Sequence, residues 1–150
     1  MLLSEQIALS GAGIFFLIGL LSGVWKYLAI VASSEARAHE YVDILHRASL
    51  MYGFAGIVVW KFAELSIHDE VWNLIGVLGL NVFFAFAILT YLIHAVSKDT
   101  DNQLRPPYVL GGRPIPGFLI HGGMWLLIAG EVGGFLILFS GAWPAIWFVF

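Results

Sequence analysis

Three histidines are the residues of this chain with the clearest potential for chemistry. His46, His94 and His121 each lie within about two helical turns of one end of a long apolar segment. If these segments run as antiparallel neighbours, the three imidazoles share one depth near the same membrane face. Neutral imidazoles ligate haem iron, and helical bundles hold such cofactors in their cores. We therefore predict that the histidines converge, and that two of them hold haem b or line a quinone site.

Two other interpretations of the histidines stay open from the sequence. Three imidazoles and the Asp43 carboxylate suit a zinc, iron or copper ion, or a proton relay, although the HxxxH and HExxH spacings of dedicated metal helices are absent. Alternatively, the chain binds no cofactor. Histidines near the ends of membrane spans then form hydrogen bonds with water or lipid phosphate.

Charged residues inside apolar segments are the second group of candidates, because ionisable groups at membrane depth are costly and often functional. Lys26 and Arg47 are predicted partners for an anionic group, and Lys26 could instead snorkel to the surface or neutralise Asp43. Glu131 lies ten residues after His121, about 15 Å deeper. We expect Asp43 and Glu131 to be buried acids. Glu131 either donates a hydrogen bond to Asn81 or a backbone carbonyl, or belongs to a proton path.

The composition places these residues in a membrane protein. Of 150 residues, 60% are hydrophobic and 11% are charged, whereas soluble domains carry about 25% charged residues. The net charge of −3 offers no basic surface for nucleic acid. Because the chain has no cysteine, disulfides, thiolate nucleophiles and iron–sulfur clusters are excluded.

Four segments are long and apolar enough to cross a bilayer, whose ~30 Å core needs about 20 helical residues. We predict spans at about 7–32, 41–65, 71–96 and 117–142, with Pro144 ending or kinking the last. The first span lacks the basic start of a signal peptide, so we expect it to be retained. Short links predict a single domain, 1–150, folded as an all-α, antiparallel four-helix transmembrane bundle.

The basic residues predict the orientation of this bundle. Six of the seven lie in or near the links 33–40 and 97–116. Basic links face the cytoplasm. We therefore expect both links to be cytoplasmic and both termini to face outward, in a bacterial inner membrane. The six residues are Lys26, Arg37, Arg47, Lys98, Arg105 and Arg113.

Glycines and the long third link suggest how the helices pack. Gly19 and Gly23 form a small-xxx-small pattern that lets another helix approach. The fourth span is thin because its glycines include Gly122, Gly123, Gly130, Gly133 and Gly134. Asn81 is expected to form a hydrogen bond between helices. The link 97–116 is rich in proline and glycine and could fold back over the nearby membrane face.

Two short segments resemble a known family. Residues 44–49, Ile-Leu-His-Arg-Ala-Ser, resemble the S-I-x-H-R-x-S-G signature of the cytochrome b membrane-anchor subunit of succinate dehydrogenase. Residues 90–99, with His94 followed by Asp99, are similar to that family's haem-ligand region. The resemblance implies that His94 ligates haem and that Arg47 and Ser49 lie beside a quinone. The family has three spans and a glycine where this chain has Leu50.

These observations predict an integral membrane subunit that binds haem b or quinone for electron transfer within a larger complex. The chain is also similar to small four-span bacterial inner-membrane proteins with no assigned activity. The alternative function is a non-catalytic accessory or scaffold subunit that packs through its glycine-rich faces. A transporter is a third interpretation, which would require oligomers. The expected partners are membrane lipids and either other membrane subunits or further copies of the chain.

Overall fold

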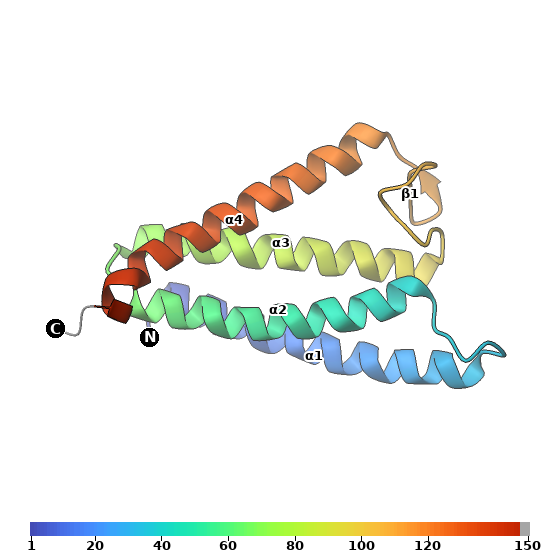
Figure 1. Ribbon diagram of the computed structural model, residues 1–150, viewed down its shortest axis with the longest axis horizontal. Coiled ribbons are helices and arrows are strands. Elements are labelled where there is room, and N and C mark those ends of the chain that lie inside the picture. The colour runs from blue at the N-terminus through green and yellow to red at the C-terminus, as the bar shows by residue number, and fades with distance from the viewer. Residues whose placement is uncertain (148–150) are drawn as a thin grey trace.

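Four long helices account for most of the computed structural model, which describes residues 1–147. All four are long and apolar enough to cross a membrane. The chain runs up and down, so the start of α1 and the end of α4 lie at the same end of the bundle (Figure 1). The predicted all-α four-helix bundle with four membrane spans is therefore confirmed. The elements are α1 (Leu3–Ala32), α2 (Glu40–Leu65), α3 (Glu70–Ser97), β1 (Val109–Leu110), β2 (Arg113–Pro114) and α4 (Gly117–Trp147).

The first three helices begin and end within a few residues of the predicted spans. The fourth differs, because α4 continues through Pro144 to Trp147. Of the two effects predicted for Pro144, an end of the helix is contradicted, and a kink stays a prediction. A proline lacks an N–H donor and its ring crowds the carbonyl four residues earlier, but both effects act here about one turn from the end of α4, and the final turn still forms.

α1 and α2 form a close pair along most of their length. Gly53 faces the backbone of Phe16, and a Cβ atom added to this glycine would lie 2.9 Å from the Phe16 Cα. Gly56 faces Ala12 in the same way, and Gly19 faces Leu50. Small residues therefore let these two helices approach closely, as the pattern at Gly19 predicts.

α3 packs against α2 around aromatic side chains. The Tyr52 ring of α2 stacks on Phe84 of α3 with 4.2 Å between ring centroids, and Phe15 of α1 meets Phe84 edge-on. The Asn81 side-chain amide donates to the Ile7 carbonyl across 3.0 Å. This bond joins α3 to α1, so the expected hydrogen bond between helices is present.

α4 packs against the other helices mainly through its C-terminal half. There Gly130 meets Phe83, Gly134 meets the Gly76 carbonyl and Leu138 is fully buried. The Ile67 amide, in the link before α3, donates to the Gly141 carbonyl across 3.0 Å. Toward its N-terminus α4 diverges from α3 (Figure 1).

The segment 98–116 fills the space where α3 and α4 diverge. Its tip is a short antiparallel hairpin of β1 and β2, whose turn uses Gly111 and Gly112 at φ of 62° and 75°. Glycine adopts such angles at no steric cost, because it has no Cβ atom. The Gln103 amide donates to the Tyr41 hydroxyl across 2.7 Å, which holds the segment against α2. The segment therefore folds back over the bundle.

Candidate functional site

His94 is the buried imidazole of the bundle. It lies in the last turn of α3 with no exposed surface, and the Tyr41 ring packs 4.6 Å from it between centroids. Its Nδ1 atom forms a 2.7 Å hydrogen bond with Asp99 Oδ1. The position of the imidazole is thus determined by packing on one side and by a carboxylate on the other.

Asp99 reaches His94 because the chain reverses just after α3. Lys98 adopts a left-handed conformation, φ 50°, and its amide donates to the His94 carbonyl across 2.8 Å. Asp99 Oδ2 accepts from the Gly112 amide at 2.8 Å. Burial raises the pKa of Asp99, but its hydrogen bonds with His94 and Gly112 outweigh that effect and leave the pKa below its ordinary value. Asp99 is therefore an ionised acceptor, and His94 Nδ1 carries the hydrogen.

The other nitrogen of His94 has no partner. Nε2 is buried, and no described residue forms a hydrogen bond with it. When the ring is neutral and Nδ1 donates to Asp99, Nε2 presents a lone pair; when the ring is charged, Nε2 presents an N–H. Leaving such an atom buried and unpaired costs about 1–3 kcal/mol. An unpaired buried nitrogen is therefore expected at a position where a ligand binds.

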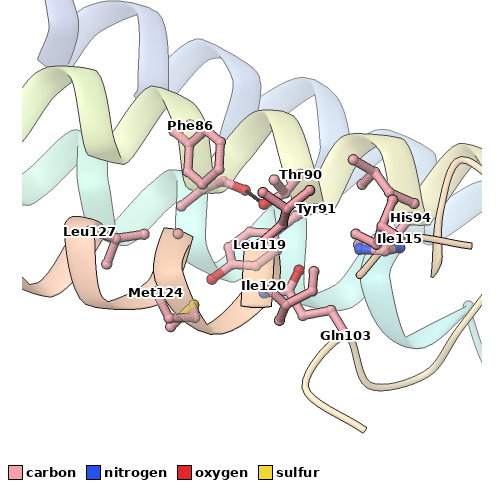
Figure 2. Close-up of a pocket in the computed structure, with 13 residues that line it drawn as sticks. Phe86, Thr90, Tyr91, His94, Gln103, Ile115, Leu119, Ile120, Met124 and Leu127 are labelled. Atoms are coloured by element: carbon pink, nitrogen blue, oxygen red, sulfur yellow. Dashed lines mark hydrogen bonds between the residues drawn. The ribbon is translucent and has the colours of Figure 1, made fainter. Parts of the chain in front are cut away.

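His94 lines a pocket of about 210 Å³ between α3 and α4. Figure 2 shows side chains of α3 and α4 around one space, with Gln103 and Ile115 from the segment 98–116. The walls are almost wholly apolar. Phe86 and Leu119 line the pocket and are about half exposed. The pocket therefore opens sideways between α3 and α4, where the bilayer lies if the helices span it.

His46 does not reach this pocket. Its Nδ1 atom lies 2.8 Å from the Gly19 carbonyl of α1, and its ring packs against Gly23. The imidazole therefore occupies the contact between α1 and α2. Its hydrogen-bond partner is backbone from a neighbouring helix, which suits a structural role.

His121 lies on the exposed side of α4. Its Nε2 atom is 3.1 Å from the Tyr108 hydroxyl, and the two rings meet edge-on. The predicted convergence of His46, His94 and His121 is therefore wrong. Within residues 1–147, no three His, Cys, Asp or Glu side chains are grouped to hold a metal ion.

Lys26 and Arg47 are both engaged by Asp43. Lys26 on α1 and Arg47 on α2 form ion pairs with the two carboxylate oxygens of Asp43. Lys26 is thus the counter-charge that the sequence allowed as one of its roles. These residues join α1 to α2 and do not line the pocket beside His94.

Ser49 is fully buried, and its hydroxyl has no hydrogen-bond partner among the described residues. It does not line the pocket beside His94. The family resemblance implies that Arg47 and Ser49 lie beside a quinone. Neither residue lines this pocket.

Glu131 lies one helical turn beyond Leu127, which lines the pocket. Its Oε1 atom is buried and has no partner among the described residues. The expected hydrogen bond to Asn81 is not formed, because Asn81 faces α1.

Sequence reasoning missed three features of the site. Tyr41, Gln103 and Met124 gave no signal, because an isolated tyrosine, amide or thioether is common in spans and links alike. Asp99 was noticed only through the family resemblance. An aspartate five residues after a histidine at a helix end is a usable signal, because a left-handed residue there turns the chain back.

Comparisons with protein-family models, with curated proteins and with solved structures give no match to this chain.

Proposed function

We propose that this protein is an integral membrane subunit that binds the head group of a lipophilic quinone in the pocket between α3 and α4. The observation that carries the proposal is His94, a buried imidazole with one nitrogen held by Asp99 and the other unpaired beside an apolar pocket. Electron transfer to or from the quinone takes place within a larger complex.

The His94–Asp99 pair suits both oxidation states of a quinone. A quinone carbonyl accepts a hydrogen bond from the charged ring, and a quinol hydroxyl donates to the neutral ring. In both cases Asp99 accepts from Nδ1 and keeps the ring in one orientation. One imidazole can therefore bind the oxidised and the reduced ligand at the same position.

The size and the walls of the pocket favour a single substituted ring. Its volume is about 210 Å³, against roughly 300–1,000 Å³ for sites that enclose a drug-sized ligand. The opening between Phe86 and Leu119 gives an isoprenoid tail a path into lipid. Haem b is the weaker candidate, because a porphyrin is larger than this space and His46 and His121 have other partners.

A quinone site needs an electron donor or acceptor, and the described helices and the segment 98–116 form no large soluble domain that could hold one. We propose that a partner subunit supplies this centre. Following the basic residues, we place the protein in a bacterial inner membrane with the segments 33–40 and 97–116 on the cytoplasmic side. The pocket is then close to the cytoplasmic surface.

The test is direct binding of a decyl-substituted para-benzoquinone to the purified protein in lipid nanodiscs. His94→Ala removes the hydrogen-bonding nitrogen and is expected to weaken binding about 10- to 100-fold, the range for a bond to a charged group. His121→Ala is the matched control, because its ring is exposed and outside the pocket.

Equal binding by His94→Ala and the unchanged protein would overturn the proposal, as would no binding by the unchanged protein. An absorption spectrum of the same sample adds an independent check. Haem bands that disappear in His94→Ala would assign the pocket to haem instead.

A further inference from the structure

We propose that a hollow beside the link 33–39 binds the phosphate group of an anionic phospholipid. This inner hollow lies where the end of α1 meets the start of α2 and the end of α3, and its volume is about 330 Å³. It is at the same end of the bundle as the segment 98–116 (Figure 1). No described residue lines both this hollow and the pocket beside His94, so the inference does not rest on the proposed quinone site.

Two cationic side chains line the polar end of the inner hollow. Arg37 belongs to the link between α1 and α2, and Lys98 directly follows α3. Both are exposed, and none of the ion pairs formed by the described residues includes either of them. The Ser33 hydroxyl lines the same end and accepts from the Glu35 amide across 3.2 Å, which leaves its hydrogen for a ligand. Two positive charges and a hydroxyl donor are therefore available to one anion.

The carboxylates near these cations lie outside the inner hollow. Glu35, Glu40 and Asp101 line an adjoining outer hollow, which is formed by residues of the links and the helix ends. None of the described residues that line the inner hollow carries a carboxylate. His39 stands between the two hollows and has its own partners, because its Nδ1 atom accepts from the Tyr41 amide and its Nε2 atom lies 3.4 Å from Asp101. An anion in the inner hollow therefore meets cations without a competing carboxylate.

The other end of the inner hollow is apolar and follows α1 toward the middle of the bundle. Trp25, Ala29 and Ala32 are spaced by four and three residues, so they lie on one face of the helix. Val42 of α2 also lines this end. From Trp25 to Ser33 the helix rises about 12 Å. The hollow is thus elongated, with charge at one end and apolar surface at the other.

This combination of charge and shape identifies the class of ligand. A free phosphate ion uses only the polar end, whereas a phospholipid places its phosphate between Arg37 and Lys98 and the start of an acyl chain along Trp25 and Ala29. Arginine and lysine form strong, charge-assisted hydrogen bonds with phosphate, and basic pockets at the ends of membrane helices bind anionic head groups. A zwitterionic lipid also brings an ammonium group, which the two cations repel. An anionic phospholipid therefore fits both ends best.

The test titrates the purified protein in neutral detergent with phosphatidylglycerol and with phosphatidylcholine of the same acyl chains, and counts bound lipid by native mass spectrometry. We expect one tightly bound phosphatidylglycerol that excess inorganic phosphate does not displace. Arg37→Gln and Lys98→Gln should each weaken its binding about fivefold, and the double variant about 25-fold. Ala29→Phe, which fills the apolar end, should weaken it as well. Arg113→Gln is the matched control, because Arg113 is exposed on β2 and does not line the hollow.

Equal affinity for the two lipids would overturn the proposal, as would an equal loss in Arg113→Gln and Arg37→Gln, which would show attraction to charge alone. Displacement of the lipid by inorganic phosphate would assign the hollow to a free anion and overturn the lipid assignment. Quinone binding and its dependence on His94 are measured separately. The two proposals therefore fail in distinguishable ways.

Discussion

The two helix pairs of this protein are built differently. α1 and α2 touch through glycines spread along the pair, from Gly23 near one end to Gly56 toward the other. α3 and α4 touch through Gly76 and Gly134 near one end and separate toward the other, where the pocket lies. Figure 1 shows α1 and α2 side by side along most of their length, and α3 and α4 separating toward the segment 98–116.

The links between the helices explain part of this difference. α1 and α2 are joined by the short link 33–39, which keeps their ends close. α3 and α4 are joined by the longer segment 98–116, which covers the gap between them. Where the helices separate, the facing side chains are large, including Phe86, Met124 and Leu127. We infer that the first pair provides stability and the second provides the binding site.

The largest expected effect is a loss of stability when the close packing of α1 against α2 is disrupted. Gly53→Leu would place a side chain against the Phe16 backbone of α1, which cannot move without separating the helices. We expect a loss of about 3 kcal/mol in the free energy of unfolding, measured by thermal unfolding in detergent. Gly13→Leu is the control, because a Cβ atom there meets nothing within 4 Å. Equal stability of the two variants would contradict the closeness of this pair.

A glycine-to-leucine substitution in α4 should weaken quinone binding without lowering the stability of the protein. Gly123 lines the pocket, and a Cβ atom there would meet only Phe86, at 3.9 Å. Gly123→Leu is therefore expected to fill the pocket and weaken quinone binding at least tenfold, while leucine favours the helix by up to about 1 kcal/mol over glycine. Gly122→Leu, which meets nothing within 4 Å, should bind normally. Binding titrations that do not separate these neighbours would place the ligand elsewhere.

A smaller and more selective effect is expected at Asp99. In Asp99→Asn, the single side-chain oxygen must face the Gly112 amide if that hydrogen bond is to be kept. The NH₂ group then faces His94 Nδ1. His94 Nδ1 must then accept, and the hydrogen of the neutral ring moves to Nε2. Quinol should bind a few-fold more weakly while quinone binding is retained, as measured by titration with each redox form. Asp101→Asn, whose side chain is 87% exposed, is the control. A parallel loss of both forms would argue against the change of tautomer.

The smallest effect is expected at the ion pair between α1 and α2. The Lys26 and Asp43 side chains are 30% and 26% exposed, and Arg47 also pairs with Asp43. Lys26→Met should therefore lower the free energy of unfolding by about 1 kcal/mol or less. A double-mutant cycle with Asp43→Asn measures the coupling. A coupling well above that value would contradict the small contribution expected of this pair, and a change in quinone binding would show that the pair belongs to the site.

Much of the fold could be predicted because each span is recognisable from its own residues. About 20 apolar residues per span suffice to cross a bilayer, whatever the neighbours do. The pattern at Gly19 and the buried amide of Asn81 also predicted helix contacts, since small and polar residues have few other uses within a span.

The site could be predicted only in part. From the sequence, His94 was one of three equivalent candidates, and its partner Asp99 was indicated only by the family resemblance. Comparisons with known proteins give no match that would support this resemblance. The rotation of each helix about its axis decided which histidine faced the pocket. In a bilayer, lipid and protein core are both apolar, so the hydrophobic pattern gives little information on that rotation.

The sequence alone determined the number of spans, their order and the concentration of basic residues at one end, because these follow from composition along the chain. Only the tertiary structure decided that His46 turns to α1, that His121 turns to Tyr108, and that His94 remains beside the pocket. The physical reason is that membrane insertion depends on total apolarity, whereas a binding site depends on the directions of individual side chains, which packing alone sets.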